Sequence, residues 1–203
     1  MAGDRSQPSR PGTASDPHAQ PGVVVADKYV VEEVLGAGAM GTVVSARHKL
    51  IGQRVAIKFI SPDIVDSAAA LARFTREARA LAEVASEHVV RIVDYGTMPD
   101  DRPYLVMEYL TGRDLLKELR ARGTLPLSEA AEIVLQACEG LTAVHARGIV
   151  HRDIKPANLF LTTRSNGKLL VKIVDFGISK GPKMTDEELS ITQGSVAIGS
   201  PHF

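Results

Sequence analysis

The sequence predicts an α+β fold in which a small antiparallel sheet with one helix precedes a mainly helical part. Short Val- and Ile-rich runs separated by glycine turns fill most of the first half, as is typical of antiparallel strands. Apolar residues then recur at three- and four-residue steps from Leu115 to Val144, as is typical of helices. The change of pattern near residues 108–114 predicts a junction between two lobes.

The composition is that of a soluble globular protein. Of the 203 residues, 44% are apolar and 24% are charged. Basic and acidic residues number 24 each, and this zero balance gives no support to nucleic-acid binding or to a membrane-surface role. No apolar run reaches the ~18 residues of a membrane span, and the N-terminus lacks an apolar signal-peptide core. The single cysteine, Cys138, excludes an internal disulfide, fits a cytoplasmic location and is expected to be a small core residue.

Changes of composition and periodicity along the sequence divide the chain into three regions. Residues 1–26 are rich in Pro, Ser, Gly and Ala without periodicity, which predicts a disordered tail. We expect the small lobe over residues 27–107 and a partial, mainly helical lobe over residues 108–203.

Five Val- and Ile-rich runs predict the strands of the small lobe, over residues 28–36, 41–49, 53–60, 89–96 and 103–110. Between the third and the fourth, residues 63–86 have helical periodicity, with Asp66 or Ser67 as the expected N-cap.

The second lobe is expected to begin with a helix around Leu115 and Leu119. A longer helix should start near Ser128 and stop at Gly148. Its recurring apolar positions are Ile133, Val134, Ala137, Leu141 and Val144. Residues 157–163 and 169–177 then predict a hairpin-like pair of strands.

The stretch "LGAGAMGTVV" places Gly36, Gly38 and Gly41 in a G-x-G-x-x-G pattern, which is weak evidence when taken singly. A dinucleotide-binding fold would put a helix after the glycines and an acidic residue about 20 positions on. Here a Val-rich strand follows, and the matching region holds Lys58. The remaining interpretations are a plain hairpin turn and a flap whose backbone N–H groups approach phosphate oxygens, with Val43 packing on a base.

Lys58 is the one charged residue in the apolar strand "VAIKFI". A lone lysine in a strand is commonly an exposed edge residue. However, Glu77 shares a helix face with Phe74 and Leu81, which should face the sheet. An inward carboxylate needs a cation, and Lys58 is the candidate.

The stretch "HRDIKPANLF" concentrates charge between two apolar segments, either as an ordinary surface turn or as a site. Asp153 and Asn158 lie five residues apart, and Asp175 follows an apolar strand 17 residues later. Mg²⁺ prefers oxygen ligands and keeps several waters, so Asp175 and Asn158 suit it beside a polyphosphate. Asp153 would then accept a hydroxyl proton, and Lys155 would supply positive charge to a transferring phosphoryl group.

In combination, "GAGAMGTV", "VAIK", the helical Glu77, "HRDIKPAN" and "DFG" resemble the eukaryotic-type protein kinases. The lysine two residues after Asp153 is similar to the Ser/Thr branch, and "GTVVSARHKLIGQRVAIK" and "GSPHF" are similar to its bacterial members. The resemblance runs from about Tyr29 to Phe203.

The resemblance implies ATP and Mg²⁺ as cofactors and a protein as substrate. It makes Asp153 the catalytic base, places Lys155 at the γ-phosphate, and pairs Lys58 with Glu77. It assigns Asn158 and Asp175 to the metal. The residues implied for the nucleotide pocket are Leu35, Gly36, Gly38, Gly41, Val43, Ala56, Lys58, Met107, Glu108, Leu110, Asp114, Asn158, Phe160 and Asp175. The residues implied for a hydrophobic column joining the lobes are Leu81, Ile92, His151 and Phe176.

The resemblance also implies regulation by phosphorylation, with Arg152 pairing a phosphorylated loop residue. Thr185, Ser190, Thr192 and Ser195 are available, and Thr192 is preferred for its position before "GSP".

The family continues beyond the position of Phe203 with helices that complete the large lobe, so we expect the helix at 128–147 to lack its main packing partner. Two functions therefore stay open. One is a Ser/Thr protein kinase, and the other is a catalytically incomplete ATP-binding or protein-interaction module.

Overall fold

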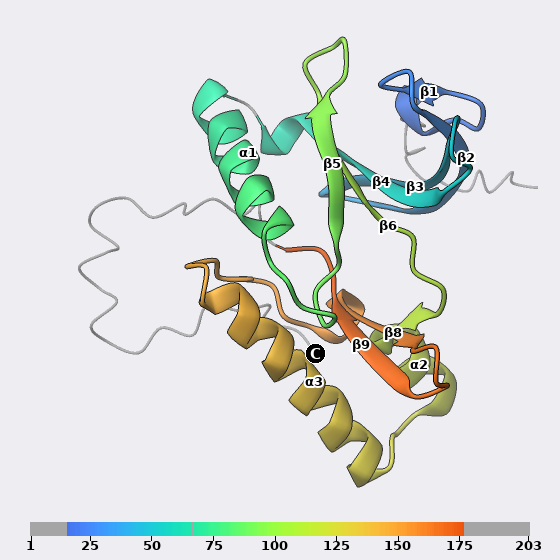
Figure 1. Ribbon diagram of the computed structural model, residues 1–203, viewed down its shortest axis with the longest axis vertical. Coiled ribbons are helices and arrows are strands. Elements are labelled where there is room, and N and C mark those ends of the chain that lie inside the picture. The colour runs from blue at the N-terminus through green and yellow to red at the C-terminus, as the bar shows by residue number, and fades with distance from the viewer. Residues whose placement is uncertain (1–15, 66, 177–203) are drawn as a thin grey trace, which may run out of the picture.

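The structure is a computed structural model that describes residues 16–65 and 67–176. Figure 1 shows two lobes, with most of the strands and helix α1 in one and helices α2 and α3 in the other. The predicted α+β class is confirmed. In the described part of the chain, no helix combines the length and the apolar character needed to cross a membrane.

The small lobe is an antiparallel sheet of six strands in the order β1-β2-β3-β4-β6-β5, with α1 beside it. The strands are β1 (Val24–Val25), β2 (Tyr29–Gly38), β3 (Gly41–His48), β4 (Arg54–Ile60), β5 (Ile92–Thr97) and β6 (Pro103–Glu108). The helices are α1 (Ala68–Ala82) and the 3-10 turns η1 (Pro17–Ala19) and η2 (Pro62–Ile64). Ser67 caps α1, as one of the two predicted caps, by accepting a hydrogen bond from the Ala70 backbone N–H at 3.2 Å.

Over its described residues, the large lobe holds two α-helices and a second sheet of three antiparallel strands in the order β7-β8-β9. Its elements are β7 (Arg113–Asp114), α2 (Leu115–Arg122), α3 (Leu127–His145), η3 (Pro156–Asn158), β8 (Leu159–Thr163) and β9 (Leu169–Ile173). The β8–β9 hairpin is the pair of strands that the sequence predicts.

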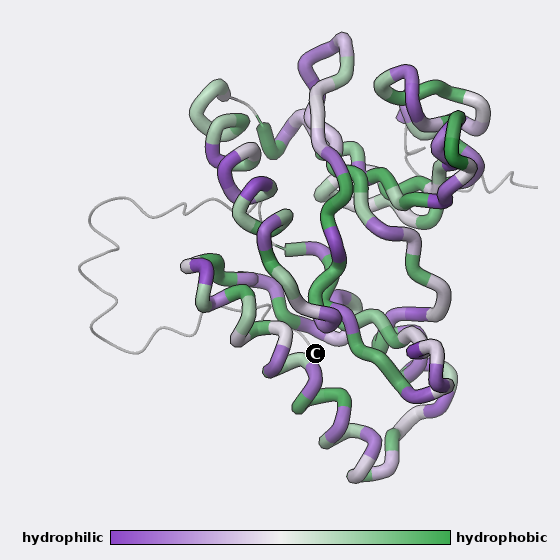
Figure 2. The backbone as a smooth tube through the Cα atoms, viewed as in Figure 1, coloured by the Kyte–Doolittle hydropathy of each residue, from purple (hydrophilic) through white to green (hydrophobic). Residues whose placement is uncertain are grey.

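One apolar core runs through both lobes. Phe74 and Leu81 from α1 are buried in the same cluster as Ile133 of α3 and Phe176, which follows β9. A second buried cluster packs on the other face of the six-stranded sheet and includes Phe59. Figure 2 shows the apolar colouring concentrated along the strands and between the lobes. Because the lobes share buried surface, residues from both can be held at their boundary.

The predicted tail over residues 1–26 is wrong for its last part. Residues 16–25, which we call the strap, form η1 and β1 and pack on the small lobe. Ala19 and Val25 are buried, and Arg102 donates two hydrogen bonds to Asp16, at 2.7 and 2.8 Å. The composition does not predict the strap because contacts with distant residues, such as Arg102, hold it in place. Such contacts leave no periodic pattern in the sequence of the segment itself.

Helix α3 also departs from the prediction. It begins at Leu127 after Pro126, so Ser128 is not its cap. Gly148 follows the end of the helix with φ of +71°, the left-handed backbone expected at such a stop. Val134 is 58% exposed and Cys138 is exposed, so neither is a core residue in the described structure. Both positions belong to the apolar pattern, but α3 buries only the side that faces β9 and the segment before β5.

Candidate functional site

A pocket lies at the boundary of the lobes, roofed by the β2–β3 hairpin. Ten of the residues predicted for a nucleotide pocket line it, namely Leu35, Gly36, Val43, Ala56, Met107, Glu108, Leu110, Asp114, Phe160 and Asp175. Val90, Ala157 and Val174 line it too and were not predicted. Each lies within a predicted strand or motif, but which side chain turns inward depends on the local register and twist of the backbone.

Two of the predicted glycines are outside this lining. Gly38 and Gly41 pair with each other at the tip of the β2–β3 hairpin. Gly41 has φ of +124°, and a Cβ there would lie 1.9 Å from the Phe59 carbonyl oxygen. Glycine at this position is therefore required by the hairpin itself, whatever the hairpin covers.

Lys58 projects from β4 into the space behind the pocket, where its side chain is only 9% exposed. Its Nζ lies 2.9 Å from Oδ1 of Asp175. Lys58 and Asp175 also line an inner cavity together with Leu81, Ile92 and Phe176. A buried ammonium is stable only when it is paired, and Asp175 supplies that charge.

The predicted pair between Lys58 and Glu77 is not the one that the structure contains. Glu77 lines a different cavity, together with Arg76, Arg147 and Arg152. Burial raises the pKa of the Glu77 carboxyl, although Arg152, Arg76 and Arg73 act in the opposite direction. Phe74 and Leu81 are buried in the core as expected, but Glu77 lies at the cavity lined by residues of the large lobe and does not reach Lys58 as an ion-pair partner.

Asp153, Lys155 and Asn158 form a compact cluster at the start of η3. Nζ of Lys155 lies 2.8 Å from Oδ2 of Asp153. Nδ2 of Asn158 donates to the Asp153 carbonyl oxygen at 2.7 Å and to Asp153 Oδ2 at 3.1 Å. Asp153 and Asn158 are both 4% exposed. Since the Asn158 amide nitrogen is committed to Asp153, its oxygen is the atom left to accept a donor or to ligate a cation.

The ring of His151 fixes how this cluster meets the end of β9. Nε2 of His151 lies 3.1 Å from the Val174 carbonyl oxygen, and Nδ1 accepts the backbone N–H of Asp153 at 3.2 Å. These two contacts assign the proton to Nε2. The ring also packs against Phe176 in a tilted arrangement, with centroids 4.7 Å apart and an interplanar angle of 51°. The predicted column residues Leu81, Ile92 and Phe176 lie in one core cluster, and His151 joins it through this contact.

Backbone contacts bring the two halves of the site together. Val174 donates its N–H to the Asn158 carbonyl oxygen at 3.0 Å, which places Asp175 beside η3. Arg152 and Asp175 have positive φ angles of 62° and 55°, a left-handed backbone that is strained for these residue types. Such strain is held only where the surroundings impose it, and it concentrates at functional sites.

The side chains of two predicted pocket residues already make hydrogen bonds within the protein. The Asp114 carboxylate caps α2 by accepting the Lys117 N–H at 2.8 Å. Oε1 of Glu108 accepts the Arg91 N–H and the Lys172 ammonium, each at 2.8 Å. The Glu108 side chain is therefore tied behind the pocket, and its backbone N–H is also engaged, donating to the Arg91 carbonyl oxygen at 3.0 Å.

The loop hydroxyls predicted as phosphorylation sites, Thr185, Ser190, Thr192 and Ser195, lie outside the described residues. Within the described part of the chain, no group of three or more His, Cys, Asp or Glu residues could hold a metal. The expected ligand set, Asn158 and Asp175, contains one amide and one carboxylate. Oxygen donors of this kind suit Mg²⁺ shared with a polyphosphate.

Comparisons with known proteins agree with this geometry. A family model described as protein kinase domain matches residues 29–201. A probable serine/threonine-protein kinase PknB of Corynebacterium glutamicum is 36% identical over 183 residues, which are 89% of this chain and 27% of that protein. Serine/threonine-protein kinase Pkn1 of Myxococcus xanthus is 40% identical over 171 residues, 83% of this chain and 24% of that protein.

A solved structure of the Mycobacterium tuberculosis PknI kinase domain, a C20A_R136A double mutant, superposes with a TM-score of 0.73 at 31% identity. The superposition covers 85% of this chain and 67% of that one. The chain thus spans about a quarter of the length of these two curated relatives.

Proposed function

This chain belongs to the protein kinase family, and on that premise we propose that it transfers the γ-phosphoryl group of ATP to a serine or threonine hydroxyl of a protein. The observation that carries the proposal is the meeting of two clusters. Asp153, Lys155 and Asn158 form one, Lys58 and Asp175 form the other, and the Val174–Asn158 backbone hydrogen bond joins them.

The pocket suits a nucleotide because the side that would hold the purine is apolar and the opposite end is charged. Val43, Ala56 and Phe160 offer surfaces to a purine ring, and the backbone from Glu108 to Leu110 offers hydrogen-bonding groups at its edge. Lys58 and Asp175 lie at the other end, where a triphosphate would extend.

Asn158 and Asp175 would hold Mg²⁺, which when bound would neutralise charge on the phosphate oxygens. Lys58 would then exchange its contact with Asp175 for the α- and β-phosphates. Pairing of Lys58 with Glu77 remains a prediction for that nucleotide-bound arrangement.

In the transfer step the hydroxyl oxygen of the substrate forms a bond to the γ-phosphorus, and the bond to the β–γ bridging oxygen breaks. Asp153 accepts the hydroxyl proton, because its buried carboxylate is fixed by Asn158 and Lys155. Lys155 can turn from Asp153 toward the transferring group and offset its negative charge. ADP leaves with the electron pair of the broken bond.

The test is transfer from γ-labelled ATP to the chain itself and to a basic protein substrate. We expect Asp153→Asn to lower the rate by about 10²–10⁴-fold while Mg²⁺–ATP still raises the unfolding temperature. Equal transfer by the wild-type chain and by Asp153→Asn would contradict the assignment of Asp153.

A second candidate function is an ATP-binding or interaction module without transfer. It is favoured by the contact between Lys58 and Asp175 and by the position of Glu77 away from Lys58. Stabilisation by Mg²⁺–ATP with no transfer by either protein would select this alternative.

A further inference from the structure

The tip of the β2–β3 hairpin, residues 38–41, rests on the far end of β4, where the chain turns into η2. Gly41 pairs with Ile60 in the sheet, and the Ser61 backbone N–H donates to the Met40 carbonyl oxygen at 3.2 Å. The residues of the hairpin tip are exposed or half-buried. Contacts with the end of β4 therefore have a large share in fixing where the tip lies.

Arg102 connects this end of β4 to the strap. Its Nε donates to the Ile60 carbonyl oxygen at 3.3 Å, while its two terminal nitrogens donate to the two carboxylate oxygens of Asp16, at 2.7 and 2.8 Å. A guanidinium is a planar fork, so holding two of its nitrogens on a carboxylate also sets the direction of the third. The position of Asp16 therefore determines how Nε of Arg102 meets Ile60.

The strap holds Asp16 in place through contacts of its own. The Asp16 carboxylate caps η1 by accepting the His18 backbone N–H at 3.0 Å. Nε2 of His18 lies 2.8 Å from Oδ2 of Asp100, which is in the same β5–β6 turn as Arg102. The His18 ring also packs against Phe59 of β4, with centroids 5.8 Å apart. The strap thus contacts both the turn that carries the arginine and the strand that the arginine meets.

Strand β4 carries these contacts to the phosphate end of the pocket. Side chains alternate along a strand, so Phe59 lies in the cluster that includes strap residues, while Lys58 and Ile60 line the inner cavity with Asp175. Ile60 is also the pairing partner of Gly41. A shift at the end of β4 would therefore move the hairpin tip and disturb the surroundings of Lys58 together.

We propose that Arg102, oriented by Asp16, is a positioning residue for the hairpin tip and, through it, for the phosphates of the nucleotide. The statement about phosphates rests on the proposed function, and the statement about the tip does not. Backbone N–H groups bind phosphate oxygens best when they already point at them, and a tip that is ordered beforehand loses less conformational entropy on binding. Loss of the link should weaken contacts with phosphate and spare those with the base.

The test compares Arg102→Lys and Asp16→Asn with wild type, each as the whole chain. A lysine ends in a single nitrogen, so it can approach Asp16 or Ile60 but cannot hold both in a fixed geometry. Asp16→Asn leaves the arginine in place and weakens its anchor. We expect the two substitutions to act in the same direction, and the milder Asp16→Asn keeps the test valid if Arg102→Lys folds poorly.

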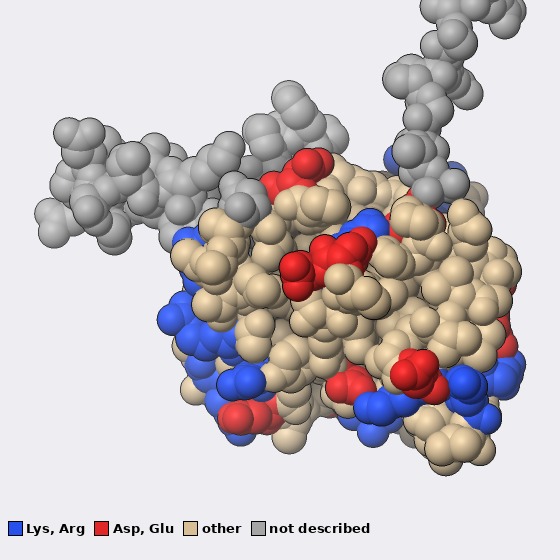
Figure 3. All heavy atoms as spheres, turned by 90° about the horizontal axis from the view of Figure 1, so that it is seen from above, with Lys and Arg blue, Asp and Glu red and all other residues tan. Residues whose placement is uncertain are grey.

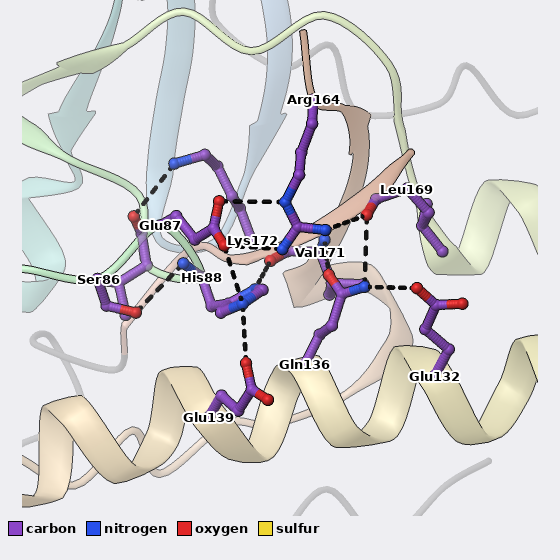
Figure 4. A network of polar contacts seen from close by, with 11 residues as sticks. Ser86, Glu87, His88, Glu132, Gln136, Glu139, Arg164, Leu169, Val171 and Lys172 are labelled. Atoms are coloured by element: carbon purple, nitrogen blue, oxygen red, sulfur yellow. Dashed lines mark hydrogen bonds and ion pairs between the residues drawn. The ribbon is translucent and has the colours of Figure 1, made fainter. Parts of the chain in front are cut away.

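Arg164→Lys is the matched control, because Arg164 also bridges a carboxylate and a backbone carbonyl. It donates to the two carboxylate oxygens of Glu87, at 2.8 and 3.2 Å, and to the Leu169 carbonyl oxygen at 2.8 Å. Figure 4 shows this arrangement, which lies between the segment before β5 and the β8–β9 hairpin. The control therefore removes the same kind of bridge at a place away from the hairpin tip.

The first readout is amide hydrogen exchange without nucleotide, followed at Ser61, whose N–H bonds to the hairpin tip. We expect Arg102→Lys and Asp16→Asn to speed this exchange several-fold and Arg164→Lys to leave it unchanged. The α3 amides in the same samples correct for changes in overall stability. Wild-type exchange at Ser61 in both strap variants would overturn the proposal.

The second readout compares the affinities for Mg²⁺–ATP and for adenosine, which has no phosphates. We expect Arg102→Lys to bind Mg²⁺–ATP about three- to tenfold more weakly than wild type and adenosine equally well, and Arg164→Lys to change neither affinity. Equal weakening of both ligands by Arg102→Lys would overturn the role in positioning phosphates. Faster exchange at Ser61 in a chain whose wild type binds no ATP would support the link to the tip and refute the proposed function instead.

Discussion

At the residue scale, the chemistry of the site depends on which carboxylate each cation meets. Lys58 meets Asp175, and Lys155 meets Asp153, so both candidate phosphate-binding lysines are neutralised by carboxylates in this structure. Each lysine must change partner when a polyanion arrives. This pairing keeps two buried or half-buried ammonium groups stable until then.

Glu77 offers a test of which partner its carboxylate serves. Its pKa is raised mainly by burial, so the folded protein holds the proton more tightly than the unfolded chain does. The stabilisation linked to that proton is complete below the carboxyl's unfolded pKa and is lost as the pH rises through the folded pKa. We therefore expect Glu77→Gln to match or exceed the wild-type unfolding temperature at pH 7.

The control for Glu77→Gln is the same comparison at pH 4, where any gain over wild type should shrink because the wild-type carboxyl is then largely protonated. We also expect weaker Mg²⁺–ATP binding by the variant, since Lys58 would lose its predicted partner in the bound state. A variant that is less stable than wild type at pH 7 would show that Glu77 already makes a favourable ion pair without nucleotide.

Whether a site residue could be predicted depends on whether its position is determined by neighbours in the sequence or by distant parts of the chain. Asp153, Asn158 and Asp175 follow from local spacing, and the structure brings them together through contacts within a few residues of each motif. The partner of Lys58 could not be predicted in this way. It depends on the rotation of α1 and on the backbone of Asp175, and neither is encoded in a short pattern.

At the scale of elements, the strap shows what composition misses. Its sequence is poor in periodic apolar residues, yet Asp16 and Arg102 form a doubly hydrogen-bonded ion pair with side chains 8% and 12% exposed. Arg102 also donates to the Ile60 carbonyl oxygen at 3.3 Å, at the end of the strand that carries Lys58. The strap is thus fastened to the far end of β4.

We expect Asp16→Asn to lower the free energy of unfolding by about 1–3 kcal/mol, because it leaves a nearly buried guanidinium with a weaker partner. That change corresponds to a fall of several degrees in the unfolding temperature. Glu83→Gln is the matched control, since Glu83 forms an exposed ion pair with Arg147 and should cost at most about 1 kcal/mol. Equal effects of the two substitutions in thermal denaturation would contradict an integral role for the strap.

The helices show how far an apolar periodicity predicts which side chains are buried. The apolar period of α1 predicts its buried side, and Phe74 and Leu81 are buried as expected, with Ala78 between them. The period of α3 includes Val134 and Cys138, which are exposed, because periodicity reports which side chains are apolar and not which of them are covered. A helix with apolar residues around much of its circumference cannot be oriented from sequence alone.

At the scale of the whole molecule, the two lobes are joined by a common core, by the β6–β7 connection and by polar contacts behind the pocket. The Lys172–Glu108 ion pair links β9 to the end of β6 at 2.8 Å. On the face in Figure 3, Lys and Arg side chains gather toward the rim and are interspersed with acidic ones.

The central claim is that Asp175 holds a magnesium ion shared with ATP, and titration calorimetry of ATP into wild type and Asp175→Asn, with and without Mg²⁺, tests it most directly. We expect Mg²⁺ to tighten ATP binding to wild type at least tenfold and to change binding to Asp175→Asn much less. The same Mg²⁺ dependence in both proteins, or no ATP binding to wild type under any of these conditions, would contradict the account.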